Sequence, residues 1–133
     1  MRFAIIGLLA LSQLGCAASA ERQRQEIESI DYGEPLSQVE AQAIAKGYFE
    51  SVLKDPYSAI YDFGSVNTGW LRESILNGRD LHYGYVLDVK VNAKNSFGGY
   101  TGATPYKFVI LNGRIESIFQ MKSGSWTKIL PFP

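Results

Sequence analysis

Few residues in this chain could do acid–base or nucleophilic chemistry, because its 133 residues include a single histidine, His82. A Ser-His-Asp hydrolase needs a histidine beside an activated serine. No serine stands in a Gly-x-Ser-x-Gly sequence, and His82 lies between Leu81 and Tyr83 at the start of a predicted strand. We therefore expect a half-exposed strand histidine without a catalytic role.

Metal binding requires several histidine, cysteine or carboxylate ligands to converge on one point. Asp80, His82 and Asp88 follow one another along a single predicted strand, so they could meet only if that strand folded back. We predict no metal site and no cofactor.

A pair of carboxylates is the remaining catalytic possibility, since two of them flanking a glycosidic bond can cleave it. Asp62 and Asp88 lie on different predicted strands, but nothing in the sequence separates them from solvated surface charges. They support an alternative function, a soluble periplasmic enzyme or inhibitor acting on peptidoglycan. An enzyme is not the expectation favoured here.

The segment 91–102, VNAKNSFGGYTG, combines three glycines and two asparagines, residues that tolerate a positive φ. It lies between two predicted strands. It is not a phosphate-binding loop of the Gly-Lys-Ser/Thr type, because that ending is absent and a strand follows instead of a helix N-terminus.

Two interpretations of this loop stay open. In the first, the loop presents a binding surface for a sugar or a partner protein, formed by Lys94, Asn95, Phe97 and Tyr100. In the second, the two aromatic rings cap the open end of the core. Asn92 and Asn95 then hydrogen-bond the backbone of the loop itself.

The N-terminus is predicted to be an export signal. Met1-Arg2 is followed by an apolar run from Phe3 to Leu14, which is too short for the ~20 residues that span a bilayer. The only cysteine, Cys16, follows at once, and Gly15-Cys16-Ala17 resembles a bacterial lipobox, although Gln13 stands where leucine is preferred. The cysteine of a lipobox is lipidated, with acyl chains such as palmitate, and becomes the mature N-terminus.

Two other outcomes remain open for this segment. Ala18-Ser19-Ala20 is a small-x-small site at which signal peptidase would release a soluble chain beginning at Glu21, and the signal could also stay uncleaved as an anchor. The favoured division is a signal peptide over 1–15, a lipid-anchored polar tether over 16–35 and a small domain over 36–133.

Composition excludes one class of partner. The chain carries 13 basic and 13 acidic residues, so its net charge is zero and the basic surface of a nucleic-acid-binding protein is absent. With a single cysteine, no disulfide can form within the chain.

The elements that would position these residues can be predicted from periodicity. Ser37 and Glu40 form a capping box, and a helix is predicted from there to about Lys54, before Pro56. Its expected apolar face consists of Val39, Ala43, Ile44, Gly47, Tyr48, Ser51 and Val52.

Strands are predicted over 57–63, 81–91, 105–111 and 115–121, where apolar residues alternate. Asn112-Gly113 is a hairpin turn signal between the last two. Residues 70–76 fit a strand or a short helix, and 123–133 could add one short strand. The predicted fold is therefore α+β, with one amphipathic helix packed on an antiparallel sheet of about four strands.

Three segments, LKDPYSA at 53–59, YGYV at 83–86 and the 91–102 loop, resemble a family of small exported proteins of Gram-negative bacteria, many of them known only as lipoproteins. The likeness covers roughly 51–114 and implies no catalytic residues. The resulting expectation is a cell-envelope lipoprotein with a non-catalytic binding or scaffolding domain, partnered by an envelope protein or glycan. Ala17, where inner-membrane lipoproteins often carry aspartate, favours the periplasmic face of the outer membrane.

Overall fold

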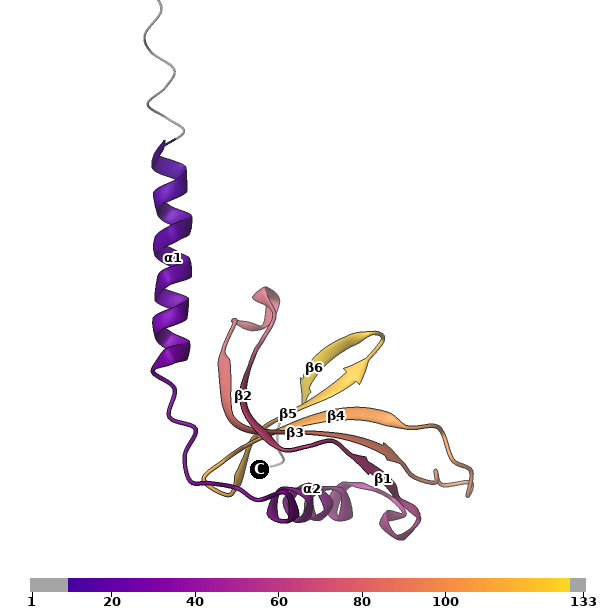
Figure 1. The fold of residues 1–133 in the computed structure, drawn as a ribbon. Coiled ribbons are helices and arrows are strands. Elements are labelled where there is room, and N and C mark those ends of the chain that lie inside the picture. The colour runs from indigo at the N-terminus through magenta and orange to yellow at the C-terminus, as the bar shows by residue number, and fades with distance from the viewer. Residues whose placement is uncertain (1–9, 130–133) are drawn as a thin grey trace, which may run out of the picture. The chain divides into compact units, whose positions relative to one another are not determined.

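A computed structural model describes residues 10–129, in which the chain divides into two compact units with the boundary between Asp31 and Tyr32 (Figure 1). The first unit contains helix α1, Ala10–Glu28. Residues 21–28, expected to be a polar tether, are the last turns of this helix, so the prediction of a single helix was wrong. None of the helices within residues 10–129 is long and apolar enough to span a bilayer.

The second unit is an α+β domain that pairs one helix, α2, with an antiparallel sheet, as predicted. Within the described residues the sheet has six strands, two more than expected. They are β1 Ile60–Phe63, β2 Asn67–Arg72, β3 Leu81–Asn92, β4 Thr104–Leu111, β5 Arg114–Lys122 and β6 Ser125–Ile129. Two short 3₁₀ helices, η1 Pro56–Ser58 and η2 Ile75–Asn77, lie in the connections.

Helix α2 runs from Gln38 to Val52 and begins at the predicted capping box. The Ser37 hydroxyl accepts the Glu40 backbone N–H at 3.3 Å, and the Glu40 carboxylate accepts the Ser37 N–H at 3.0 Å. The Ser37 hydroxyl also donates to the Glu40 carboxylate at 2.6 Å, and this bond, followed by the one from the Ser37 N–H, holds the pKa of Glu40 below its usual value. The helix stops at Leu53, ahead of Pro56, as expected of a residue close before a proline.

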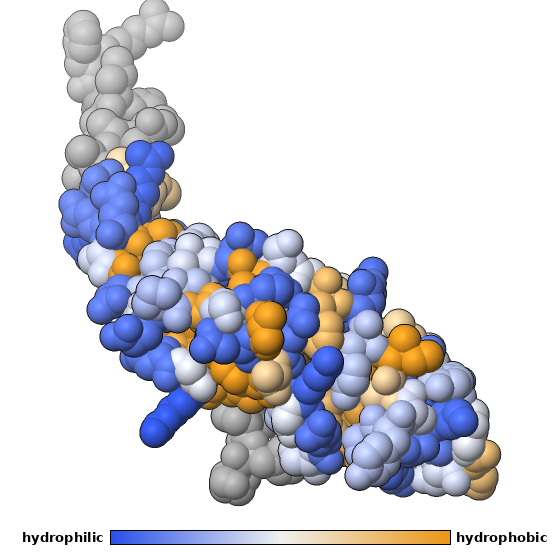
Figure 2. Space-filling model, turned by 60° about the horizontal axis from the view of Figure 1, so that its bottom comes forward, coloured by the Kyte–Doolittle hydropathy of each residue, from blue (hydrophilic) through white to orange (hydrophobic). Residues whose placement is uncertain are grey.

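The apolar face of α2 was predicted only in part: Ile44, Tyr48 and Val52 pack against the core as expected, but the fully buried residues are others. Ala41, Ala45 and Phe49, spaced four residues apart, are fully buried, whereas Val39 is 76% exposed. Two alanines let the helix approach the sheet closely, and Phe49 then fills the space beyond them. On the side of the molecule that Figure 2 brings forward, hydrophobic residues lie in several places among hydrophilic ones.

Strand β3 organises the sheet because both short strands pair with it. β1 pairs with its C-terminal part and β2 with its N-terminal part, and the remaining order is β3-β4-β5-β6. Leu87, Val89 and Val91 on one face of β3 join Phe108, Ile110 and Ile118 beneath α2 to form the core. The predicted Asn112-Gly113 turn joins β4 to β5, with φ values of +50° and +71°.

Gly84 lets β3 lie unusually close to β4. A Cβ on Gly84 would lie 2.4 Å from the Ile110 carbonyl oxygen, and the residue has a φ of +152°. The pairing of β4 with β5 shifts register at Val109/Ile110, beside the same place. A bulge bends a strand and increases its twist, and the β2–β3 and β5–β6 hairpins rise from the sheet on the side away from α2 (Figure 1).

The first strand was predicted three residues too long. β1 begins at Ile60, and Tyr57 lies in η1 with its side chain fully exposed. Ile60 is 57% exposed, while Tyr61 and Phe63 pack against the core. Alternation along so short a segment does not determine which face is buried.

Candidate functional site

The predicted binding loop is fastened to η1 at one end of the domain. The Tyr100 hydroxyl donates to the Ser58 carbonyl at 3.0 Å, and the Ser58 hydroxyl accepts the Lys94 backbone N–H at 3.0 Å. The Lys54 ammonium donates to the Ser96 hydroxyl at 2.8 Å. Two segments about 40 residues apart in sequence are thereby joined into one surface.

Two asparagines hold the backbone of the loop. Asn95 Oδ1 accepts the N–H groups of Phe97 and Gly99, at 2.9 and 3.1 Å, and Asn92 Oδ1 accepts that of Gly102 at 3.2 Å. Lys94 and Tyr100 form an isolated bridge across the loop. Asn95 is therefore a structural residue of the loop through its oxygen, which has accepted two bonds.

The aromatic side chains point out of this frame. Phe97 is 96% exposed and Tyr100 47%, and Tyr57 on the neighbouring η1 is 100% exposed. We call Tyr57, Phe97 and Tyr100 the aromatic tip. Phe97 does not cap the core, so that part of the second interpretation is wrong.

The four candidate binding residues do not line one cavity. Lys94 and Asn95 line a hollow of about 260 Å³ at the foot of the loop, together with Lys54, whereas Phe97 and Tyr100 lie outside its lining. The Lys94 ammonium lies 5.6 Å from the centre of the Tyr100 ring, within range of a cation–π contact. The structure thus offers an exposed aromatic surface with a basic hollow beside it.

His82 is not the half-exposed strand histidine that we expected. Its side chain is 8% exposed and each ring nitrogen faces a carboxylate, with Nε2 2.7 Å from Glu73 Oε1 and Nδ1 2.8 Å from Glu116 Oε1. Lys128 Nζ lies 2.7 Å from the same Glu73 oxygen. We call Glu73, His82, Glu116 and Lys128 the His82 cluster.

The two carboxylates hold the ring of His82 between them. A carboxylate only accepts hydrogen bonds, so a ring nitrogen that bonds an ionised glutamate is the donor of that bond. The hydrogen bonds from Lys128 and then from His82 hold the pKa of Glu73 below its usual value. Glu73 therefore links the imidazole ring of His82 to the ammonium of Lys128.

The His82 cluster does not form a metal site. Its two carboxylates lie on opposite edges of one imidazole ring, so they cannot converge on a single ion. Within residues 10–129, no three histidine, cysteine or acidic side chains are placed to hold a metal.

Sequence reasoning missed this cluster because its members come from separate parts of the chain. Glu73 follows β2, His82 opens β3, Glu116 lies on β5 and Lys128 on β6. Only the strand order and register bring them together. The only sign of the cluster in the sequence was His82 itself. It stands in a predicted strand whose other polar positions carry residue types that are common on protein surfaces.

The two aspartates considered for glycoside cleavage line one hollow of about 340 Å³. Asp88 is ion-paired with Lys107, and its side chain is 57% exposed. A catalytic acid of this kind requires a raised pKa, which burial ordinarily supplies. The exposed, ion-paired Asp88 does not have that environment.

Comparison with known proteins adds no functional assignment, since no family model, no curated protein and no solved structure matches this chain.

Proposed function

We propose that this chain is a bacterial cell-envelope lipoprotein whose α+β domain binds another envelope component through the aromatic tip. The observation that carries the binding role is the exposure of two aromatic side chains, Tyr57 at 100% and Phe97 at 96%, on segments that hydrogen bonds hold in place. Aromatic residues on a preorganised surface bind partners at a low cost in conformational entropy.

The proposed location in the cell envelope rests on the N-terminal sequence. Cys16 directly follows an apolar run after Met1-Arg2, in a chain with no other cysteine. It lies in α1 with an exposed side chain. Cleavage before Cys16 would remove the residues that precede it and leave residues 16–35 to connect the lipid to the domain.

The binding role is tested by cross-linking in the intact envelope of a Gram-negative host that expresses the full chain. Leu76 provides a matched control, because it is a large apolar side chain that is 95% exposed but lies in the β2–β3 connection. We expect a discrete adduct that Phe97→Ser and Tyr57→Ser abolish and Leu76→Ser preserves. An adduct equally strong in all three variants, or no adduct with the unaltered chain, would contradict the proposal.

A peptidoglycan-directed enzyme or inhibitor is the second candidate, favoured only by the presence of Asp62 and Asp88 in one hollow. Its test is cleavage of purified peptidoglycan, or inhibition of a peptidoglycan hydrolase, by the unaltered chain and by Asp88→Asn. Activity that disappears in Asp88→Asn while the fold persists would support this candidate over simple binding.

A further inference from the structure

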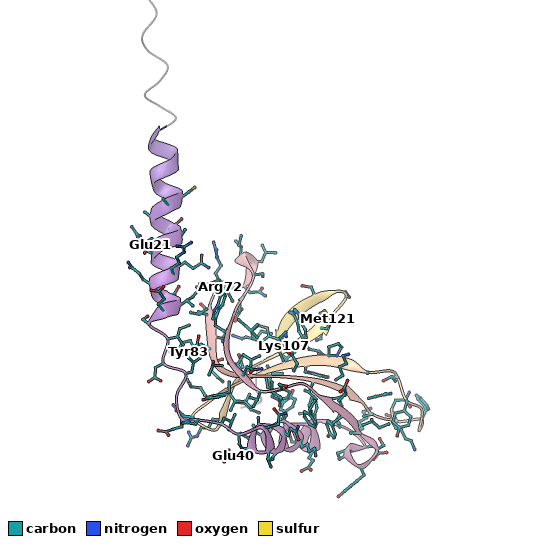
Figure 3. All side chains as sticks on the ribbon, viewed as in Figure 1. Glu21, Glu40, Arg72, Tyr83, Lys107 and Met121 are labelled. Carbon is teal, nitrogen blue, oxygen red and sulfur yellow. The ribbon has the colours of Figure 1, made fainter. Side chains whose placement is uncertain are left out.

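A second concave surface lies on the face of the sheet opposite α2. Because side chains alternate along a strand, Asp88 and Lys90 point away from the core that Leu87 and Val89 join. Figure 3 labels Lys107 on that side of the sheet and Glu40 of α2 on the other. Two hollows open on this face, and Lys107 and Trp126 line both, so the hollows adjoin.

The smaller hollow has more cationic than anionic side chains in its lining. Lys107 and Lys128 line it with a single carboxylate, that of Glu73, which is already bonded to Lys128 and to His82. Its volume is about 120 Å³, room for about four water molecules at ~30 Å³ each. A carboxylate or phosphate group has that size and the complementary charge.

The His82 cluster gives this hollow a fixed wall. Glu73 has a side chain 7% exposed, and its Oε1 lies 2.7 Å from both His82 Nε2 and Lys128 Nζ. Lys128 is therefore held in one place by a buried anion that His82 holds in turn. A cation positioned in advance loses little freedom when a ligand binds.

The larger hollow suits a hydroxylated ring. Its volume of about 340 Å³ is within the range of small-molecule sites. The Trp126 side chain supplies an apolar wall, and its ring centre lies 5.0 Å from the Lys107 ammonium. Lys107 is ion-paired with Asp88, and Asp62, Asp88 and Lys90 keep further acceptors and donors, so a ring with several hydroxyls finds both kinds of partner.

We propose that these adjoining hollows form a binding site for an anionic sugar, with the ring against Trp126 in the larger hollow and its carboxylate or phosphate in the smaller one. Lys107, which lines both, contacts the ring and the anion. An acidic peptide satisfies the small hollow but makes no use of the hydroxyl-binding groups in the large one. This site shares no residue with the aromatic tip, so it is tested independently of the binding role proposed for the tip. Asp62 and Asp88 of the larger hollow are also the residues of the second candidate function.

The test is a titration of the purified ¹⁵N-labelled chain, followed through its amide resonances, with glucuronate, glucose 6-phosphate, glucose, inorganic phosphate and a short glutamate-containing peptide. We expect the two charged sugars to shift the amides of Lys107 and Trp126 and to bind at least about tenfold more tightly than glucose or phosphate. Preference between the two charged sugars distinguishes a carboxylate ligand from a phosphate ligand.

Three variants make the result specific. Lys107→Gln and Trp126→Ala should each weaken binding of the charged sugar about tenfold or more. Lys122→Gln, an exposed lysine of β5 outside both hollows, should leave it unchanged. Thermal unfolding of each variant checks that the fold persists.

Several results would overturn the proposal. One is the absence of saturable binding by either charged sugar up to millimolar concentration. Others are equal binding of inorganic phosphate and glucose 6-phosphate, tighter binding of the peptide than of the sugars, and equal loss in Lys107→Gln and Lys122→Gln.

Discussion

Glu73 Oε1 and His82 Nε2 lie 2.7 Å apart between two side chains that are each more than nine-tenths buried. Glu116 bonds the other ring nitrogen of His82, and Lys128 bonds the same oxygen of Glu73. The cluster links the ends of β2 and β3 to β5 and β6 on the face away from α2. On that face the cluster acts beside buried Val109 and Phe119, and the Phe119 ring lies 5.5 Å from that of His82, centre to centre.

The cluster predicts how stability depends on pH. Its neighbours lower the pKa of Glu73 from the usual 4.5, so the unfolded chain takes up a proton at this carboxyl more readily than the folded chain. The contribution is complete above about pH 4.5 and is lost as the pH falls through the lowered value. Thermal unfolding followed from neutral pH to about pH 3 should show this loss.

Glu73→Gln isolates that contribution. We expect this variant to unfold at a lower temperature than the unaltered chain at neutral pH and to lose less stability on acidification. Glu50→Gln, an exposed carboxylate of α2, is the matched control. Parallel pH profiles for the unaltered chain and Glu73→Gln would contradict the assigned role.

Replacing each of two glycines with alanine should change the stability of the domain in opposite directions. Gly47 lies in α2, and a Cβ added to it would have nothing within 4 Å, so Gly47→Ala should stabilise the domain by roughly 0.5–1 kcal/mol. Gly84→Ala should destabilise it, because the new methyl group would meet the Ile110 carbonyl. Urea unfolding of both variants measures the two signs, and a neutral Gly84→Ala would show that the close approach of β3 to β4 is not required.

Phe49 should be the most costly side chain of α2 to remove. Its ring lies 5.0 Å from that of Tyr106 and 5.5 Å from that of Phe108, centre to centre, and it is fully buried. Phe49→Ala should lower the free energy of unfolding by about 3–5 kcal/mol. Val39→Ala, on the exposed side of the same helix, should change the free energy of unfolding little. A loss comparable to that of Phe49→Ala would mean that Val39 lies on the packed face of the helix, as the sequence predicted.

The hydrogen bonds that hold the backbone of the 91–102 loop can be tested without a ligand. Asn95→Ala removes the acceptor of the Phe97 and Gly99 amides, so hydrogen exchange at these two amides should accelerate about tenfold. Asn95→Asp keeps an acceptor at the same place and should largely preserve their protection. Unchanged exchange in Asn95→Ala would show that the loop is held by other contacts.

Local signals predicted much of the fold. The Ser37 capping box, the long β3 and the Asn112-Gly113 hairpin depend on residues close in sequence, and each is present. The buried stripe of α2 was missed because Ala41 and Ala45 are small enough to suit a core or a surface. The sequence did not decide whether β2 and β6 are strands, because neither alternates clearly between apolar and polar residues.

The candidate sites were less predictable than the fold, because they depend on contacts between segments that are far apart in the sequence. The loop could be identified from its glycines and asparagines, but whether Phe97 is buried depends on the space left by η1 and the sheet. The His82 cluster and the hollows beside Lys107 are products of strand register, which pairs residues far apart in the chain. The spacing of residues along the sequence does not indicate which residues the strand register brings together.

Whether the protein is anchored by a lipid can be decided by the mass of the mature protein purified from the membranes of a Gram-negative host, beside Cys16→Ala. We expect a chain that begins at Cys16 and carries a diacylglycerol group and an acyl chain, both absent from the variant. A soluble periplasmic chain beginning at Glu21, identical in the variant, would contradict a lipid-anchored protein.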